Sequence, residues 1–315
     1  MPRNGTSVFD FFARFPDELA CLQYIFETRW GNHSPCPRCG RLGHWFHLKG
    51  TKKYQHACHC QVSVLEGTIF YRSNISLMAW FYAMLLAGNS SIGVRGTHIR
   101  KQLGLGTKST VRLGNLIRLQ MAAYDRQAML GGPGQTVYVD EALIRYGQEV
   151  GLGGAATGHI VMGFATEEHI LTGIVPDRRA STIISHVERI IRPGTRIITD
   201  GHASYKSLGK RSWRHVVVNH SVAFHDFAGN NTSRIETYWR VLKRTLAAYR
   251  RVHSQYLWLY IAEAEFRYNF RNSDISAFEH LISRFPVVWG ENLDRIGRRF
   301  DWRPSQSFQA YNWCE

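Results

Sequence analysis

Two stretches of sequence decide the fold: residues 136–140 read Thr-Val-Tyr-Val-Asp, and residues 196–200 read Arg-Ile-Ile-Thr-Asp. Each is a run of strand-forming residues that closes on a carboxylate, which predicts two buried strands that each end at an aspartate. Further strands are predicted at residues 158–165, 169–175 and 214–219, and amphipathic helices at residues 180–191 and 231–250. The second half of the chain is therefore expected to be an α/β domain.

This order of elements is similar to that of the ribonuclease-H-like fold, in which the first and fourth strands lie side by side. We therefore expect Asp140 and Asp200 to meet at one edge of the sheet. Glu236 is the one acid between Phe227 and Tyr260, and the helix that carries it follows the fifth strand. A lone aspartate at a strand end is more often a turn or cap residue. Three converging carboxylates instead predict a site for two Mg²⁺ ions, which neutralise them and promote phosphoryl transfer.

The predicted helix at residues 231–250 carries cations beside this acid. Arg240 and Lys243 follow Glu236 at spacings of four and seven residues, so the three share one helix face. The simpler interpretation is an ion pair within the helix. The alternative is a metal-binding acid flanked by cations that hold DNA, with Arg240 and Arg244 as the DNA contacts.

The cysteines predict a metal site near the N-terminus. Cys36 and Cys39 form a Cys-x-x-Cys pair, and Cys58 and Cys60 follow as a Cys-x-Cys pair. Four thiolates close a tetrahedral Zn²⁺ site, and the intervening sequence is typical of the short strands of a zinc ribbon. His56 and His59 are alternatives for one of the thiolates. Six cysteines in 315 residues are too few for a disulfide scaffold.

The charge indicates a polyanionic partner. The formal net charge is +15, and Glu66 is the one acid between Thr28 and Tyr124. A basic solvated face is the simpler interpretation, but so uneven a distribution favours phosphate. The longest apolar run, residues 77–87, is shorter than the ~20 residues of a membrane span, and the N-terminus lacks the pattern of a secretory signal. We therefore expect a cytoplasmic protein that binds DNA and no membrane.

A helix-turn-helix segment is predicted after the ribbon. A short helix at residues 97–103, the turn Gly104-Leu-Gly106 and a longer helix from Thr107 form this arrangement. The cations expected to face a major groove or its phosphates are Lys108, Arg112 and Arg118. An ordinary helical hairpin is the alternative. The predicted boundaries are 1–72 for the N-terminal segment with the ribbon, 73–130 for the helical segment, 131–275 for the catalytic domain and 276–315 for the tail.

Taken in order, these motifs resemble bacterial insertion-sequence transposases with an N-terminal zinc ribbon and a DDE core, the ISXO2-like group related to the Merlin transposons. The segments that carry the resemblance are Arg29–Gly31, Cys36–Gly40, Gly67–Phe70, Asp140-Glu141, Thr199–Gly201, Ile235-Glu236 and Glu265–Asn269. They are individually common, but their order and spacing are specific to this family.

The resemblance implies a DNA transposase that binds terminal inverted repeats, cleaves the element ends and joins the 3′-hydroxyl to target DNA. Asp140, Asp200 and Glu236 would bind Mg²⁺ or Mn²⁺, and Lys243 would be the accompanying base. The implied partners are the two kinds of DNA and further copies of the chain in a synaptic complex, and the implied location is the nucleoid of a bacterial cell.

One departure from the family keeps alternatives open. Ser233 stands where the family often has an asparagine that is counted in some members as catalytic. A catalytically inactive or repurposed zinc-ribbon DNA-binding protein is therefore the alternative from another functional class. A ribonuclease-H-like nuclease without strand transfer is a third hypothesis.

Overall fold

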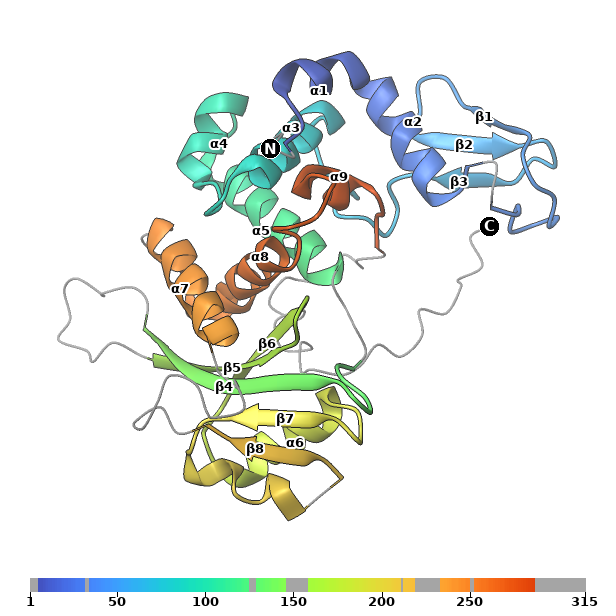
Figure 1. Ribbon diagram of the computed structural model, residues 1–315. Helices are drawn as coiled ribbons and strands as arrows, with labels where there is room; N and C mark the ends of the chain where they lie inside the picture. The colour runs from blue at the N-terminus through green and yellow to red at the C-terminus, as the bar shows by residue number, and fades with distance from the viewer. Residues whose placement is uncertain are drawn as a thin grey trace. The chain divides into compact units, whose positions relative to one another are not determined.

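The computed structural model describes residues 5–31, 34–124, 129–145, 158–210, 212–218, 233–249 and 252–286. The chain divides into two compact units (Figure 1). The first, which we call the ribbon–helix unit, extends to Tyr124 and resumes at Asn272. The second, the sheet unit, comprises Asp125–Arg271. Each unit is described separately.

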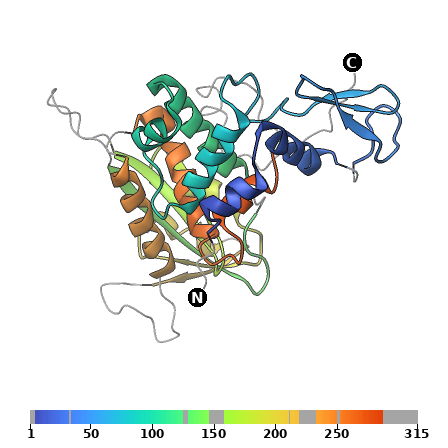
Figure 2. The ribbon, with the colours of Figure 1, turned by 90° about the horizontal axis from the view of Figure 1, so that it is seen from above.

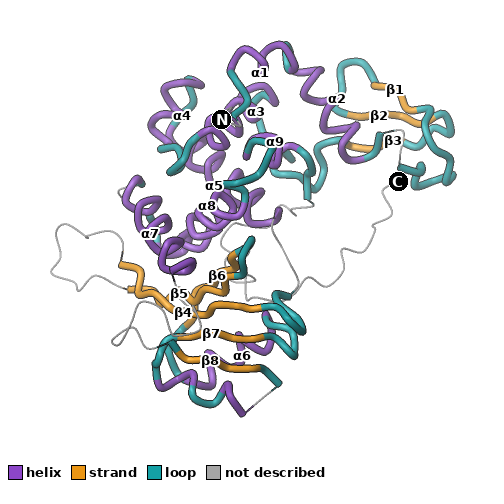
Figure 3. Tube along the Cα trace, in the orientation of Figure 1, coloured by secondary structure: helices purple, strands orange, loops and turns teal. Residues whose placement is uncertain are grey.

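The ribbon is a three-stranded antiparallel sheet with the order β1-β2-β3. Its strands are β1 (Trp45–His47), β2 (Lys53–His56) and β3 (Gln61–Ser63), orange in Figure 3. One face packs on α2 (Glu18–Arg29), where the rings of Phe26 and Tyr54 stack with centroids 3.7 Å apart. The prediction of short ribbon strands is confirmed. A sheet this small buries little apolar surface, so it depends on further cross-links for stability.

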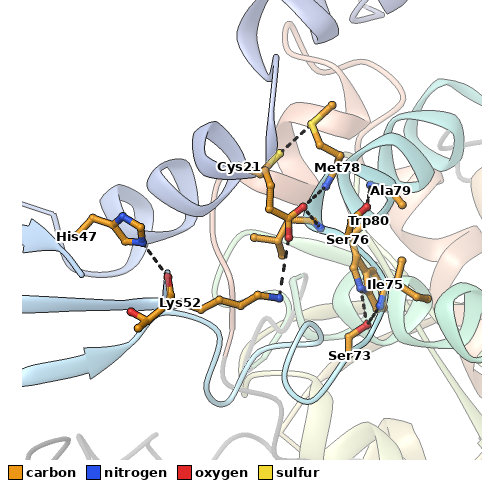
Figure 4. Close-up of polar contacts among 12 residues, drawn as sticks. Cys21, His47, Lys52, Ser73, Ile75, Ser76, Met78, Ala79 and Trp80 are labelled. Carbon is orange, nitrogen blue, oxygen red and sulfur yellow. Dashed lines mark hydrogen bonds and ion pairs between the residues drawn. The ribbon is translucent and has the colours of Figure 1, made fainter. Parts of the chain in front are cut away.

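Glu18 connects the ribbon to the helices of the same unit. Its Oε2 accepts hydrogen bonds from the backbone N–H groups of Leu77 (2.7 Å) and Met78 (3.3 Å), at the start of α3 (Leu77–Asn89) (Figure 4). Its Oε1 lies 3.9 Å from Lys52 Nζ in the ribbon. A carboxylate at a helix N-terminus satisfies free N–H groups and complements the helix dipole. This acid therefore caps the start of α3 and also lies near a cation of the ribbon hairpin.

The helices of the ribbon–helix unit close around an aromatic core. Its elements are α1 (Val8–Arg14), α3, α4 (Gly96–Leu103), α5 (Thr107–Tyr124) and α9 (Ala277–Ile282). Phe11, Phe81 and Phe278 are fully buried there. Gly88 of α3 lets α9 approach closely, because a Cβ at this position would lie 2.6 Å from Phe278 N. The helices at residues 97–103 and from Thr107 were predicted, and Gly104 ends α4 in the left-handed conformation, with φ of 63°.

The sheet unit is built on a five-stranded mixed sheet with the order β6-β5-β4-β7-β8. The strands are β4 (Thr136–Arg145), β5 (Gly158–Ala165), β6 (Ile170–Val175), β7 (Arg196–Thr199) and β8 (Arg214–Val217). β4, β5 and β6 form an antiparallel meander, and β7 and β8 run parallel to β4. The predicted pairing of the first strand with the fourth is confirmed.

Helices cover both faces of this sheet. α6 (Ala180–Ile190) packs on the face that carries Val137 and Val139. α7 (Ser233–Ala248) and α8 (Leu257–Asn269) lie side by side on the other face, which carries Ile144 (Figures 1 and 2). Because side chains alternate along a strand, Asp140 faces α7 and Glu141 faces α6.

Side chains of α8 pair with the outer edge of β6. Ile170 N–H donates to Asn269 Oδ1 (2.8 Å), and Asn269 Nδ2 donates to Ile170 O (3.0 Å). Thr172 N–H donates to Glu265 Oε2 (2.7 Å). Two residues of the Glu265–Asn269 motif therefore replace the hydrogen bonds of a missing neighbouring strand.

Candidate functional site

Four side chains of the ribbon form a metal-binding group. The ligand atoms of Cys36, Cys39, His56 and Cys58 all lie within 4.8 Å of one another. Cys36 Sγ lies 3.5 Å from Cys58 Sγ, and Cys39 Sγ lies 3.6 Å from His56 Nδ1. Tetrahedral zinc with its usual bond lengths separates such ligands by about 3.5–3.8 Å. The donor set and its spacing therefore fit Zn²⁺.

The ligand set corrects one prediction: His56 belongs to the group, and Cys60 does not. The backbone N–H of His56 donates to the backbone carbonyl of Cys60 (2.8 Å), and His59 in the intervening turn has a φ of 65°. This turn brings Cys58 to the first cysteine pair beside His56. Cys60 is 1% exposed, and its sulfur lies outside the group. Of the alternatives left open by the sequence, the structure selects His56.

Local hydrogen bonds prepare the ribbon group for a metal. Burial raises the pKa of the Cys36 thiol, but the N–H groups of Cys39 and Arg38 and the neighbouring thiols outweigh burial, so the pKa lies below its ordinary value. Cys58 N–H donates to His56 Nδ1 (3.1 Å), the ring nitrogen that also lies 3.6 Å from Cys39 Sγ, so a metal bound at Nδ1 would replace this hydrogen bond. Thiolates and a neutral imidazole are the forms that zinc binds.

The sheet unit brings Asp140 and Asp200 to neighbouring strands. Asp200 directly follows β7, as predicted. Asp140 lies within β4 and not at its end, because β4 continues to pair with β5 as far as Arg145. The parallel ladder between β4 and β7 stops at Tyr138 and Ile198. Both aspartates therefore lie two residues beyond the end of this ladder, on the face that α7 covers.

Asp140 is a partly buried carboxylate with a defined orientation. Its Oδ1 accepts a hydrogen bond from Glu141 N–H (2.8 Å), and its Oδ2 accepts one from the Trp239 indole N–H (2.8 Å). Burial raises its pKa to about 6, and the charges of Glu141 and Asp200 add to that increase against the indole hydrogen bond. Neighbouring carboxylates in such a setting fit a divalent cation, which offers the missing positive charge.

Among the described residues, Glu236 does not form a group with the two aspartates in which all ligand atoms lie within 4.8 Å of one another. It is an exposed residue in the first turn of α7. Among the residues that the structure describes, the ribbon group alone brings three or more His, Cys, Asp or Glu ligand atoms within 4.8 Å of one another. Glu236 nevertheless precedes Trp239 by three residues, which places it about one helical turn from the contact with Asp140.

Trp239 is a site residue that sequence analysis missed. Trp239 shares the apolar stripe of α7 with Ile235 and Leu242, and all three side chains are buried. Gly163 of β5 makes room for its ring, because a Cβ there would lie 2.9 Å from Trp239 Cη2. A buried indole N–H needs a hydrogen-bond acceptor. A tryptophan on the apolar face of this helix was therefore the signal in the sequence that a polar partner lies nearby.

The Trp239→Phe variant is expected to weaken binding of a divalent cation such as Mn²⁺ about tenfold, because a hydrogen bond to a charged group contributes about 1.5–3 kcal/mol. Trp213→Phe is the matched control, since the Trp213 indole donates to a backbone carbonyl, that of Arg192 (3.1 Å). Binding of Mn²⁺ and melting temperature are measured for both variants. Equal losses of Mn²⁺ affinity in the two variants would contradict a specific role for the contact with Asp140.

The predicted DNA-contacting cations differ in exposure. Lys108, Arg112, Arg240, Lys243 and Arg244 are exposed. Arg118 is 7% exposed, and its Nη1 donates to Asn115 Oδ1 (3.4 Å). Arg118 was predicted to contact DNA together with Lys108 and Arg112, but its side chain is buried inside the unit, so it is not among the proposed DNA contacts. Asn231 and Thr232 lie outside the described residues, as does the side chain of Ser233.

Comparison with known proteins gives two family matches. A family model described as the transposase zinc-ribbon domain matches residues 16–61. A model described as the ISXO2-like transposase domain matches residues 129–269. Together the two models match more than half of the chain.

Two individual proteins are also similar. An uncharacterized transposase-like protein of Haemophilus influenzae is 28% identical over 108 residues, which is 34% of this chain and 85% of that protein. A chain in the structure of a simian T-cell lymphotropic virus intasome with a PP2A regulatory subunit matches with 11% identity and a TM-score of 0.28. That match covers 53% of this chain and 63% of the viral chain, just under two thirds of its length.

The helices do not suggest a membrane span. Within the described ranges, none of them combines the length and the hydropathy that crossing a bilayer requires.

Proposed function

Because the chain belongs to the family of ISXO2-like transposases with an N-terminal zinc ribbon, we propose that it is a DDE transposase that cleaves element ends and transfers their 3′-hydroxyl strands. The observation that carries the proposal is the placement of Asp140 and Asp200 side by side beyond the β4–β7 ladder. The strand order β6-β5-β4-β7-β8 supports a ribonuclease-H-like core.

In this proposal the three acids are the metal ligands. Asp140 and Asp200 would hold Mg²⁺ or Mn²⁺ beyond the β4–β7 ladder, and Glu236, in the first turn of α7, would be the third ligand. The bound ions supply activation of the attacking oxygen and stabilisation of the leaving oxygen. Trp239 keeps one Asp140 oxygen in a fixed direction. Lys243 accompanies the acids, and Arg240 and Arg244 bind phosphates of the DNA end.

The ribbon–helix unit is proposed to bind the inverted repeats. Exposed cations of the ribbon are Arg38, Arg41, Lys49, Lys52 and Lys53. No acid lies between Thr28 and Leu65, so phosphates meet no competing carboxylate in this part of the sequence. Lys108 and Arg112 of α5 extend the proposed DNA contacts. Target DNA and a second copy of the chain in a synaptic complex, on the bacterial nucleoid, complete the proposed partners.

The proposal is tested by the joining of a labelled element end in the presence of Mg²⁺. Asp200→Asn is expected to lower joining by more than about a hundredfold, because losing a metal ligand costs more than the ~10–100-fold typical of residues behind it. Glu168→Gln changes an exposed acid of the β5–β6 turn and is expected to keep full activity. Equal joining by Asp200→Asn and the unmodified protein would refute the mechanism.

The test also separates the alternatives. Binding of the element ends without any Mg²⁺-dependent product from the unmodified protein would indicate an inactive DNA-binding protein, the hypothesis raised by Ser233. Nicked product without joined product would indicate a nuclease.

A further inference from the structure

Glu141, the neighbour of Asp140, forms a buried contact on the opposite face of the sheet. Its side chain is 5% exposed. The Tyr205 hydroxyl donates to Glu141 Oε2, and Arg178 Nε lies 3.7 Å from Glu141 Oε1. Tyr205 is fully buried. Buried charges are retained in proteins only where they are paired, as this carboxylate is. None of the roles proposed above uses it.

The same contact reaches the loop that carries Asp200. Tyr205 ends the 3₁₀ helix η1 (Ala203–Tyr205), five residues after Asp200. Asp200 Oδ1 accepts a hydrogen bond from His202 N–H (3.0 Å), which shapes the intervening turn. Ser204 Oγ donates to the carbonyl of Arg178 (2.6 Å), so the loop also holds the residue that pairs with Glu141. Glu141, next to Asp140 in β4, the η1 loop that follows Asp200, and the segment at Arg178 are therefore joined to one another.

From this arrangement we propose that Tyr205 and Glu141 are positioning residues that set the spacing of the Asp140 and Asp200 carboxylates for a divalent metal ion. The inference rests on the proposed function, because it concerns the same metal site. Neither residue touches the metal. Glu141 acts through the backbone it shares with Asp140, whose Oδ1 accepts its N–H, and Tyr205 acts through the turn after Asp200.

The chemistry of the pair suits this role. Burial and the nearby charge of Glu141 raise the pKa of Tyr205 well above its ordinary value, so its hydroxyl stays protonated and remains a donor. Asp140 and Asp200 lie beyond the last hydrogen-bonded pair of the β4–β7 ladder, so the ladder does not fix their separation. The Tyr205–Glu141 contact joins β4 to the loop that follows β7 and carries Asp200.

The test compares two tyrosines with the same kind of partner. Tyr205→Phe removes the hydroxyl that binds Glu141. Tyr249→Phe is the matched control, because the Tyr249 hydroxyl also donates to a buried glutamate, Glu263 (2.9 Å), which is itself paired with an arginine. Binding of Mn²⁺ to the zinc-loaded full chain is measured by calorimetry, and melting temperatures are recorded with and without Mn²⁺.

We expect Tyr205→Phe to weaken Mn²⁺ binding about tenfold, the lower end of the effect of residues behind a metal ligand, while Tyr249→Phe binds like the unmodified protein. Glu141→Gln should weaken Mn²⁺ binding to a similar extent. The double variant should bind Mn²⁺ as tightly as the single variant with the lower affinity, because both changes break the same contact. Unchanged Mn²⁺ binding in Tyr205→Phe would overturn this inference and leave the proposed function intact. Absence of a Mn²⁺ site in the unmodified protein would overturn both.

Discussion

The His56→Ala variant is expected to lose its zinc ion and the folded ribbon with it. The imidazole is one of four ligands, and apparent zinc-binding energies of small zinc domains are about 10–16 kcal/mol at neutral pH. The strands of the ribbon pair over only three residues each with their neighbours, so little else holds them. The same loss is expected on treatment of the unmodified protein with a strong chelator.

Two matched variants make this prediction specific. Cys60→Ala removes the cysteine that lies outside the group, and His59→Ala removes a histidine of the turn. Both should keep one zinc per chain by metal analysis. In Co²⁺-substituted protein, the absorption bands should indicate three thiolates. Retention of zinc by His56→Ala together with loss of zinc in Cys60→Ala would contradict this ligand set and support the predicted site of four cysteines.

The Glu263→Ala variant is expected to lower the free energy of unfolding by about 3–5 kcal/mol, the usual cost of removing one partner from a buried ion pair. Arg267 Nη2 lies 2.6 Å from Glu263 Oε1, and the two side chains are 6% and 3% exposed. The Tyr249 hydroxyl donates to both Glu263 oxygens. Removal of this glutamate therefore takes the ion-pair partner from a buried guanidinium and a hydrogen-bond acceptor from the Tyr249 phenol.

The control is an ion pair of the same unit that solvent reaches. Arg234 Nη2 lies 3.4 Å from Glu167 Oε1, with side-chain exposures of 41% and 79%. Exposed pairs contribute about 0–1 kcal/mol, so Glu167→Ala should change stability little. Denaturant unfolding measures both variants. A loss below about 1 kcal/mol for Glu263→Ala would show that burial of this pair has little energetic consequence.

The sequence predicted the sheet well because its signals are local. β-branched residues within 136–139 and 197–199 indicate β4 and β7, and the order of helices and strands restricts their pairing. The predicted end of this strand at Asp140 was wrong. Residues 141–145 lack a strong strand pattern, and they continue β4 only because they pair with β5. Long-range pairing of this kind leaves no mark on a single segment.

The candidate site was less predictable from the sequence, because the direction in which a side chain points depends on how the surrounding segments pack. The spacing of Cys58 and Cys60 suggested two ligands, but the turn at His59 decides which sulfur faces the first pair. Arg118 follows the charge pattern of α5, yet its side chain is buried. The partners of Asp140 and Glu141 come from Trp239 and Tyr205, far along the chain, and no spacing rule connects them.

The pairing of α8 with β6 has a consequence for how copies of this protein meet. A bare strand edge is a template on which a second chain can add its own strand, the usual first step of aggregation. Asn269 and Glu265 already occupy the outward groups of Ile170 and Thr172. This edge of the sheet is thereby closed to strand addition by a second copy, and the assembly proposed above would have to form through other surfaces.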